Sequence, residues 1–257
     1  MSSGKRVFIG VPGQKYTPTS CWDHLGETFL DPDLWGKHQV TVRANPTSGH
    51  LDMARTMLIR QGIAWRADYI AQKDSDVVIE TPFLEVMSYL AQDFSHGAGI
   101  VFSPTTSIDW KAQFHPLPGH PQSDAPNTAP FECDSGAGGF MVMTREVAER
   151  LTVLGADRTY FGTADGLPED IGLLCINRPS TDPNTPSVSE DVSLMRNVRD
   201  STGLKVVCDP RILTGHLQPI YRPSMRPIAK LQPGSLERII PPVLFKVLVD
   251  SGVLRTV

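Results

Sequence analysis

A short strand-like run meets a pair of aspartates at Ala67-Asp68-Tyr69-Ile70-Ala71-Gln72-Lys73-Asp74-Ser75-Asp76. Side chains at positions i and i+2 of an extended chain point the same way, so Asp74 and Asp76 can converge on one cation where the strand ends. Mg²⁺ and Mn²⁺ prefer carboxylate oxygens and readily keep substrate phosphates in their other coordination positions. The same pattern is also common in solvated turns, so the surrounding chain must decide between the two interpretations.

On both sides of this run, strand-like and helix-like segments alternate. We expect strands at residues 7–11, 38–43, 67–72 and 99–102, and helices at residues 51–61 and 82–94. The alternation predicts an α/β fold, a Rossmann-like α/β/α sandwich around a mostly parallel central sheet. Sites in such sheets form at the carboxyl ends of strands, which is where Pro12-Gly13 and Asp74-Ser75-Asp76 fall.

The second half of the chain mixes further elements with proline-rich stretches. We expect strands at residues 138–142 and 204–208, and helices at residues 144–154 and 190–199. Thr144 and Ser189 are suitable N-caps for these helices, and Gly203 is placed to end the second one. Residues 115–130 and 176–189 are rich in proline and are expected to form loops.

With 257 residues, the chain is near the upper limit for one hydrophobic core. We therefore expect one domain over residues 1–218 and a short helical C-terminal appendage over residues 219–257. The helical pattern of the appendage covers roughly residues 236–254. Its apolar side chains would pack on the domain or on a second subunit, which makes a homo-oligomer one possibility.

The bulk composition is that of a globular protein, with 40% hydrophobic and 20% charged residues and a net charge of −4. This balance argues against a broad nucleic-acid surface, which would need a basic excess. No signal peptide and no apolar run long enough to span a membrane is evident, so a cytoplasmic protein is expected, in the host cytoplasm if the chain is phage-encoded. Four scattered cysteines favour buried thiols over a zinc site or a disulfide framework: Cys21, Cys133, Cys175 and Cys208.

Two acids open the expected helix at residues 190–199, and a histidine follows the strand after it. Acids in a first helical turn often only complement the helix dipole, an effect of about 0.3–1 kcal/mol. In the functional interpretation, Glu190 or Asp191 is a general base and His216 is a metal ligand. A histidine seen in isolation is more often structural than a ligand, so both interpretations stay open here.

Small residues run into the expected strand at residues 138–142, in the segment Asp134-Ser135-Gly136-Ala137-Gly138-Gly139-Phe140. Such residues let a ligand approach the backbone closely, although a tight loop would use them too. The segment is neither a Gly-x-Gly-x-x-Gly fingerprint nor a Walker-type phosphate loop. Rossmann dehydrogenases and phosphate-loop ATPases are therefore disfavoured.

Four segments in a fixed order resemble glycosyltransferases with the A-type fold, in which an Ala-Arg-Asn helix precedes a strand and an Asp-x-Asp motif. The resemblance runs from Val7 to about His216. The segments are residues 53–78, with Met53-Ala54-Arg55-Thr56 and Asp74-Ser75-Asp76; residues 135–142; Ser189-Glu190-Asp191-Val192-Ser193-Leu194; and residues 209–216. Thr56 departs from the pattern, because many relatives have Asn there.

The resemblance implies a donor site for a nucleoside-diphosphate sugar, with a UDP-sugar favoured. In this site Arg55 would approach the nucleotide base or the diphosphate. Asp74 would contact the ribose or the metal, and Asp76 would bind Mn²⁺ or Mg²⁺ directly, with His216 completing the metal site. Ser75 lies at the centre of this motif. Beside the base the resemblance places the end of the first strand: Val11, Pro12 and Gly13.

The same resemblance implies how the sugar is received. Gly138 and Gly139 would border the transferred sugar, and Asp191 or Glu190 would deprotonate the acceptor hydroxyl in an inverting enzyme. The acceptor is left open between a modified DNA base, a phage or bacterial protein and a glycan. By analogy with small phage and bacterial transferases, all three fit.

Two other functions compete with sugar transfer. A nucleotidyltransferase also uses paired acids under a related sheet, but it needs a glycine-rich basic loop after the first strand, and Pro12-Gly13-Gln14-Lys15 matches that loop poorly. A non-catalytic sugar- or protein-binding module could keep the fold without the chemistry. Turnover of a nucleotide sugar with manganese separates these possibilities.

Overall fold

The computed structural model describes residues 4–13, 34, 37–46, 51–104, 114–117, 129–154, 174–175 and 188–216. Contacts group Met1–Leu217 into one compact unit, and every described residue belongs to it. The predicted appendage at residues 219–257 and its helix lie outside the described residues. Its packing and any role in oligomerisation stay predictions.

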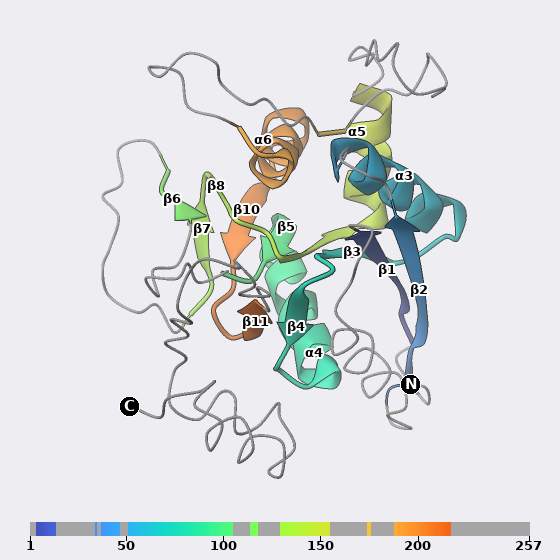
Figure 1. Cartoon of the computed structure of the whole chain (residues 1–257). Coiled ribbons are helices and arrows are strands. Elements are labelled where there is room, and N and C mark those ends of the chain that lie inside the picture. The colour runs from blue at the N-terminus through green and yellow to red at the C-terminus, as the bar shows by residue number, and fades with distance from the viewer. Residues whose placement is uncertain are drawn as a thin grey trace, which may run out of the picture. The chain divides into compact units, whose positions relative to one another are not determined.

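A seven-stranded sheet forms the centre of this unit, in the order β2-β1-β3-β9-β5-β10-β7 (Figure 1). Strands β2, β1, β3, β5 and β10 run in one direction, whereas β9 and β7 run against their neighbours. The prediction of a mostly parallel sheet is therefore confirmed. The strands are β1 (Arg6–Gly13), β2 (Gln39–Pro46), β3 (Tyr69–Lys73), β5 (Ala98–Phe102), β7 (Phe131–Cys133), β9 (Phe140–Thr144) and β10 (Lys205–Cys208).

Helices cover both faces of the sheet, which makes the predicted α/β/α sandwich (Figure 1). Because successive strand residues point to opposite faces, Ile70 packs in one core and its neighbour Ala71 in the other. The first core includes Leu58 of α3 (Leu51–Ala64), Leu151 of α5 (Arg145–Leu154) and Val198 of α6 (Glu190–Thr202). The second core includes Val86 of α4 (Phe83–Ser95).

Helix α3 and strand β3 are joined by a tight turn, and the ends of both elements differ from those predicted. The helix continues to Ala64, beyond its predicted end, and β3 begins at Tyr69 rather than Ala67. Arg66 takes a left-handed conformation with φ of 58°, and the Ala67 amide donates to the Gly62 carbonyl at 3.1 Å. The turn closes on helix carbonyls, so Ala67 and Asp68 are part of it.

Two short strand pairs outside the seven-stranded sheet were not predicted. Strand β4 (Val77–Ile79) pairs with β11 (Thr214–His216), and β6 (Phe114–His115) pairs with β8 (Ser135–Gly136). His115 therefore lies in a strand rather than in the expected loop, of which the structure describes only the ends. Elements of two or three residues carry too little periodicity to be recognised from sequence.

Of the three predicted helix caps, two are confirmed and one is not. The Val147 amide donates to Thr144 Oγ1 at 3.4 Å, and Gly203 ends α6 with φ of 69°. Ser189 occupies the N-cap of α6, but its hydroxyl makes no capping bond and donates instead to the Asp191 carboxylate.

The cysteines within the described residues carry free, buried thiols, as expected: Cys133, Cys175 and Cys208. Among the helices that the structure describes, none has the length and apolar character needed to cross a membrane.

Candidate functional site

Asp74 lies where β3 leaves the sheet, and bonds from two other segments hold it there. Its carboxylate accepts a hydrogen bond from Arg55 Nη2 at 2.7 Å. Its backbone amide donates to the Gly139 carbonyl at 2.8 Å. Ser75 is buried in the turn that follows, and the Val77 amide closes this turn on the Asp74 carbonyl at 3.2 Å. The predicted Asp-x-Asp motif therefore has a defined backbone at the sheet edge.

Arg55 joins α3 to both predicted acidic motifs. Its side chain is only 1% exposed, and its Nη2 also donates to Glu190 Oε1 at 3.2 Å. Burial alone would lower the pKa of this guanidinium, but the neighbouring Asp74, Glu190 and Asp191 outweigh it and raise the pKa. Nη1 is buried and has no hydrogen-bond partner within the described part of the chain. The guanidinium is thus a permanent cation at the centre of an acidic site.

Burial and neighbouring charges together set the ionisation of Asp74. Burial raises the pKa of its carboxyl to about 6; Arg55 opposes this shift, whereas Asp76 and Asp191 add to it. The Asp74 side chain keeps 31% of its surface exposed, so a ligand can reach it. Carboxylate oxygens with uncompensated charge are what Mg²⁺ and Mn²⁺ favour, so these residues fit the predicted divalent ion.

Gly138 and Gly139 bridge the two acidic motifs. While the Gly139 carbonyl holds the Asp74 amide, the Gly138 amide donates to Asp191 Oδ2 at 2.8 Å. A Cβ on Gly138 would lie 2.5 Å from Met141 Cε and 2.9 Å from Met195 Cε, so a side chain there would displace both methionines. The glycines keep the segment close to both aspartates.

Asp191 is oriented at the start of α6. Its Oδ1 accepts hydrogen bonds from the Val192 amide at 2.8 Å and from the Ser189 hydroxyl. Together with the bond from Gly138, three donors fix the carboxylate. An ionised carboxylate has about four acceptor positions, so room for one more donor is left.

His216 is brought to the same edge by β11. This strand pairs antiparallel with β4, and His216 stands opposite Val77, the residue after Asp76. Its side chain lies outside the described residues. Within the described part, no three His, Cys, Asp or Glu side chains form a group that could hold a metal.

The end of β1 lies beside Asp74. Gly10 pairs with Gln72 of β3, and because the two strands are parallel, Val11, Pro12 and Gly13 extend along the same edge. Val11 and Pro12 are buried. Of the segment Pro12-Gly13-Gln14-Lys15, which the nucleotidyltransferase alternative would need as its loop, Gln14 and Lys15 lie outside the described residues.

Two further residues of this region were not singled out as site residues from sequence. Lys73 is fully buried, and its Nζ donates to the Asp74 carbonyl at 3.1 Å. Thr56, noted only as a departure from the family pattern, accepts a hydrogen bond from the Leu174 amide at 3.1 Å. A charged residue at the end of a buried strand was the one signal for Lys73. No local signal pointed to the partner of Thr56.

Asp134 anchors the glycine-containing segment to α6. Arg196 Nε donates to its Oδ2 at 2.8 Å, and Arg199 Nη1 donates to its Oδ1. Burial would raise the pKa of the Asp134 carboxyl, but the hydrogen bonds from Arg199 and Arg196 outweigh it and lower the pKa. These ion pairs fix the approach of the segment to Gly138.

A cavity of about 230 Å³ lies at the end of α4 and beside β7 and β10. The predicted site residues do not line it. Its walls are formed by Gln92, Asp93, His96, Pro130, Phe131, Glu132, Lys205 and Val207.

Comparison with known proteins finds a similar fold among solved structures. No protein-family model and no curated protein matches the chain. Among solved structures, A197 from STIV aligns over 83% of this chain and 86% of its own, with a TM-score of 0.50 and 13% identity. At this identity the likeness shows a shared fold and nothing about activity.

Partial alignments include a glycosyltransferase involved in the glycosylation of the major capsid of PBCV-1. It covers 56% of this chain and 62% of its own, with a TM-score of 0.34 and 15% identity. The structure of S. aureus TarS 1–349 aligns over 56% of this chain and 48% of its own, with a TM-score of 0.35 and 14% identity.

Proposed function

We propose that this protein is a metal-dependent glycosyltransferase that moves a sugar from a nucleoside-diphosphate sugar, with UDP-sugar as the favoured donor, to an acceptor hydroxyl. One observation carries the proposal. Gly138 and Gly139 are bonded on one side to Asp74 of the expected donor motif and on the other side to Asp191 of the expected catalytic motif. A donor bound at Asp74 would thereby have its sugar beside Asp191.

The donor end of the site would hold the diphosphate and a divalent ion. Asp74 and Asp76 would supply carboxylate oxygens, and His216, whose backbone stands opposite Val77, would be the third ligand. Mn²⁺ or Mg²⁺ bound there supplies Lewis-acid stabilisation of the negative charge on the departing diphosphate. Arg55 orients Asp74 and adds a fixed positive charge. The nucleotide base would lie against the end of β1, at Val11, Pro12 and Gly13.

The acceptor end of the site needs a base. In an inverting reaction, the acceptor oxygen bonds to the anomeric carbon, the bond from that carbon to the diphosphate breaks, and the hydroxyl proton passes to a carboxylate. Asp191 is favoured for this role because three donors orient it and one acceptor position is open. Glu190 is the second candidate, but its Oε1 is occupied by Arg55.

The acceptor itself is described by one property, a nucleophilic hydroxyl. A modified DNA base, a protein side chain and a glycan all offer such a group. A panel of these acceptors, each assayed with the donor identified below, would select among them.

Binding and turnover with a panel of nucleotide sugars test the proposal. Purified protein with Mn²⁺ should bind UDP and release it slowly from its preferred UDP-sugar. If no nucleoside diphosphate binds with metal and none is released from any sugar donor, the protein is not a glycosyltransferase.

Asp76→Ala gives the residue-level check on the metal. The variant should lose metal-dependent UDP binding in isothermal titration calorimetry, because the carboxylate that binds the ion directly is gone. Unchanged affinity would remove Asp76 from the site.

A further inference from the structure

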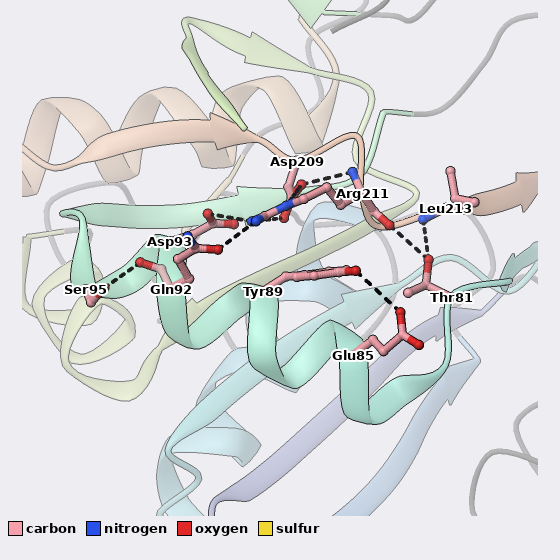
Figure 2. A network of polar contacts seen from close by, with 9 residues as sticks. All are labelled: Thr81, Glu85, Tyr89, Gln92, Asp93, Ser95, Asp209, Arg211 and Leu213. Atoms are coloured by element: carbon pink, nitrogen blue, oxygen red, sulfur yellow. Dashed lines mark hydrogen bonds and ion pairs between the residues drawn. The ribbon is translucent and has the colours of Figure 1, made fainter. Parts of the chain in front are cut away.

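A second polar network joins the C-terminal half of α4 to the turn between β10 and β11 (Figure 2). Its centre is Arg211. The Arg211 Nη2 donates to Asp93 Oδ1 at 3.1 Å and to Asp209 Oδ2 at 2.9 Å, and Nη1 donates to Gln92 Oε1 at 2.7 Å. The guanidinium also stacks 4.5 Å above the ring of Tyr89. One side chain therefore contacts three positions along α4 and one in the turn.

The network contains buried carboxyl groups, and burying such groups costs free energy unless they have partners. Asp209 is fully buried and Asp93 is 4% exposed, and buried carboxylates are tolerated only when they are paired. Arg211 binds Asp209 through both oxygens, since its Nε donates to Oδ1 at 2.9 Å and its Nη2 to Oδ2. This fork geometry is specific to arginine and fixes direction as well as distance. Movement of the turn away from α4 would leave the buried carboxyl groups of Asp93 and Asp209 without the Arg211 guanidinium.

The turn passes this restraint to β11. Thr81, just before α4, donates to the Arg211 carbonyl at 3.1 Å and accepts from the Leu213 amide at 2.7 Å (Figure 2). The Glu80 amide donates to the Leu213 carbonyl at 2.8 Å. From Leu213 the chain continues as β11, which pairs with β4 and sets His216 opposite Val77. The position of His216 beside the Asp-x-Asp motif therefore depends on bonds centred on Arg211 and Thr81.

We infer that Arg211 is a positioning residue, whose clamp on α4 fixes the backbone of β11 and with it the place of His216 opposite Val77, next to the divalent ion proposed at Asp76. This inference rests on the proposed function, in which His216 completes the metal site. It adds a residue on the α4 side of the sheet to a site that the sequence placed only at the strand ends.

Metal affinity measured in a double-mutant cycle tests the inference. In titrations of Mn²⁺ into protein with UDP, Arg211→Gln should weaken the metal about 10-fold or more, the effect usual for residues that orient metal ligands. Arg211→Lys should recover part of the loss, because the charge stays but the fork is gone. In a His216→Ala background, Arg211→Gln should have little further effect, because the residue through which it acts is absent.

Val86→Ala is the matched control, since it loosens α4 in the second core, which also includes Ile212 of the turn, but removes no hydrogen bond of Arg211. At an equal loss of Tm, this variant should keep its affinity for Mn²⁺. Unchanged metal affinity in Arg211→Gln, or a full additional loss in the His216→Ala background, would overturn the inference.

Hydrogen exchange distinguishes failure of the inference about Arg211 from failure of the proposed function. Arg211→Gln should speed exchange of the backbone amides of residues 77–79 and 214–216, whereas Val86→Ala should not. If the wild-type protein binds no metal with UDP, the proposed function fails. Unchanged exchange at residues 214–216 in Arg211→Gln overturns the clamp whether or not metal binds.

Discussion

Arg55 shows how much of the site depends on a single buried side chain. It lies on α3, yet its contacts are with Asp74 after β3 and with Glu190 at the start of α6, 135 residues away. Its guanidinium balances acids that would otherwise repel one another. A residue in this position affects folding and ligand binding together, so substitutions must be measured for both.

Arg55→Met should destabilise the protein by about 3–5 kcal/mol, because it leaves two buried or half-buried carboxylates without their cation. Unfolding in urea gives the free energy. Adding Glu190→Gln should recover part of the loss, since one of the stranded charges is removed. A loss below about 1 kcal/mol in the single variant would mean that the acids are neutralised in another way.

Asp191→Asn separates binding from chemistry. Asparagine keeps the size and one acceptor oxygen of the residue but cannot take up the acceptor proton. UDP affinity should change little, whereas sugar transfer should fall about 10²–10⁴-fold, the usual contribution of a general base. The thermal midpoint serves as the folding control. Retained transfer would move the base to Glu190 or indicate a retaining reaction.

At the scale of elements, connections at the sheet edge bring the site together. The Gly138-Gly139 segment links β3 to α6, the α3 helix contributes Arg55, and β11 returns His216 to the motif. Apart from α3, which has 14 residues, the connecting segments are short. Their geometry depends on close backbone approach and on buried ion pairs. Small changes of side-chain volume or charge should therefore alter the geometry of the site.

Gly138→Ala tests the close approach. The new methyl would collide with Met141 Cε and Met195 Cε, and overpacking of this kind typically costs about 1–3 kcal/mol. Methionine side chains can move, so the protein should still fold, but the bond from the Gly138 amide to Asp191 should be strained. We expect transfer to fall more than UDP binding. Equal, small effects on both would show that the segment tolerates the shift.

Asp93→Asn tests the acid pair at the end of α4 through its pH dependence. Burial, followed by contact with Asp209, raises the pKa of the Asp93 carboxyl to about 7, while Arg211 opposes the shift. A carboxyl whose pKa is higher in the folded than in the unfolded protein binds its proton more tightly when folded. Its contribution to the free energy of unfolding is therefore full below about pH 4 and is lost as the pH rises through about 7.

The difference in unfolding free energy between wild type and Asp93→Asn isolates this contribution from other titrating groups. Because asparagine stays neutral, the variant should gain stability relative to wild type as the pH rises from about 4 to 8. Urea titrations across this range provide the measurement. A difference that does not vary with pH would show that Asp93 ionises at its ordinary pKa.

At the scale of the whole molecule, the alternation of strands and helices could be predicted because hydrophobic periodicity is local. The periods at residues 7–11, 51–61 and 82–94 each predicted an element that the structure contains, with shifted ends. Strand ends are weakly specified by sequence, since turns such as that around Arg66 take residues from either side. The pair of β4 and β11 was missed because strands of three residues carry too little periodicity to be recognised.

Sequence by itself determined the fold class, the presence of acids at a strand end and the glycine-containing segment, because each depends on residues that are close together in the sequence. Tertiary structure alone decided that β9 runs antiparallel between β3 and β5, that Glu190 pairs with Arg55, and that His216 stands opposite Val77. Periodicity tells which face of an element is buried but not which distant element will cover it. Partners far apart in the chain are chosen by packing and by the need to pair buried charges, and these act only once the chain has folded.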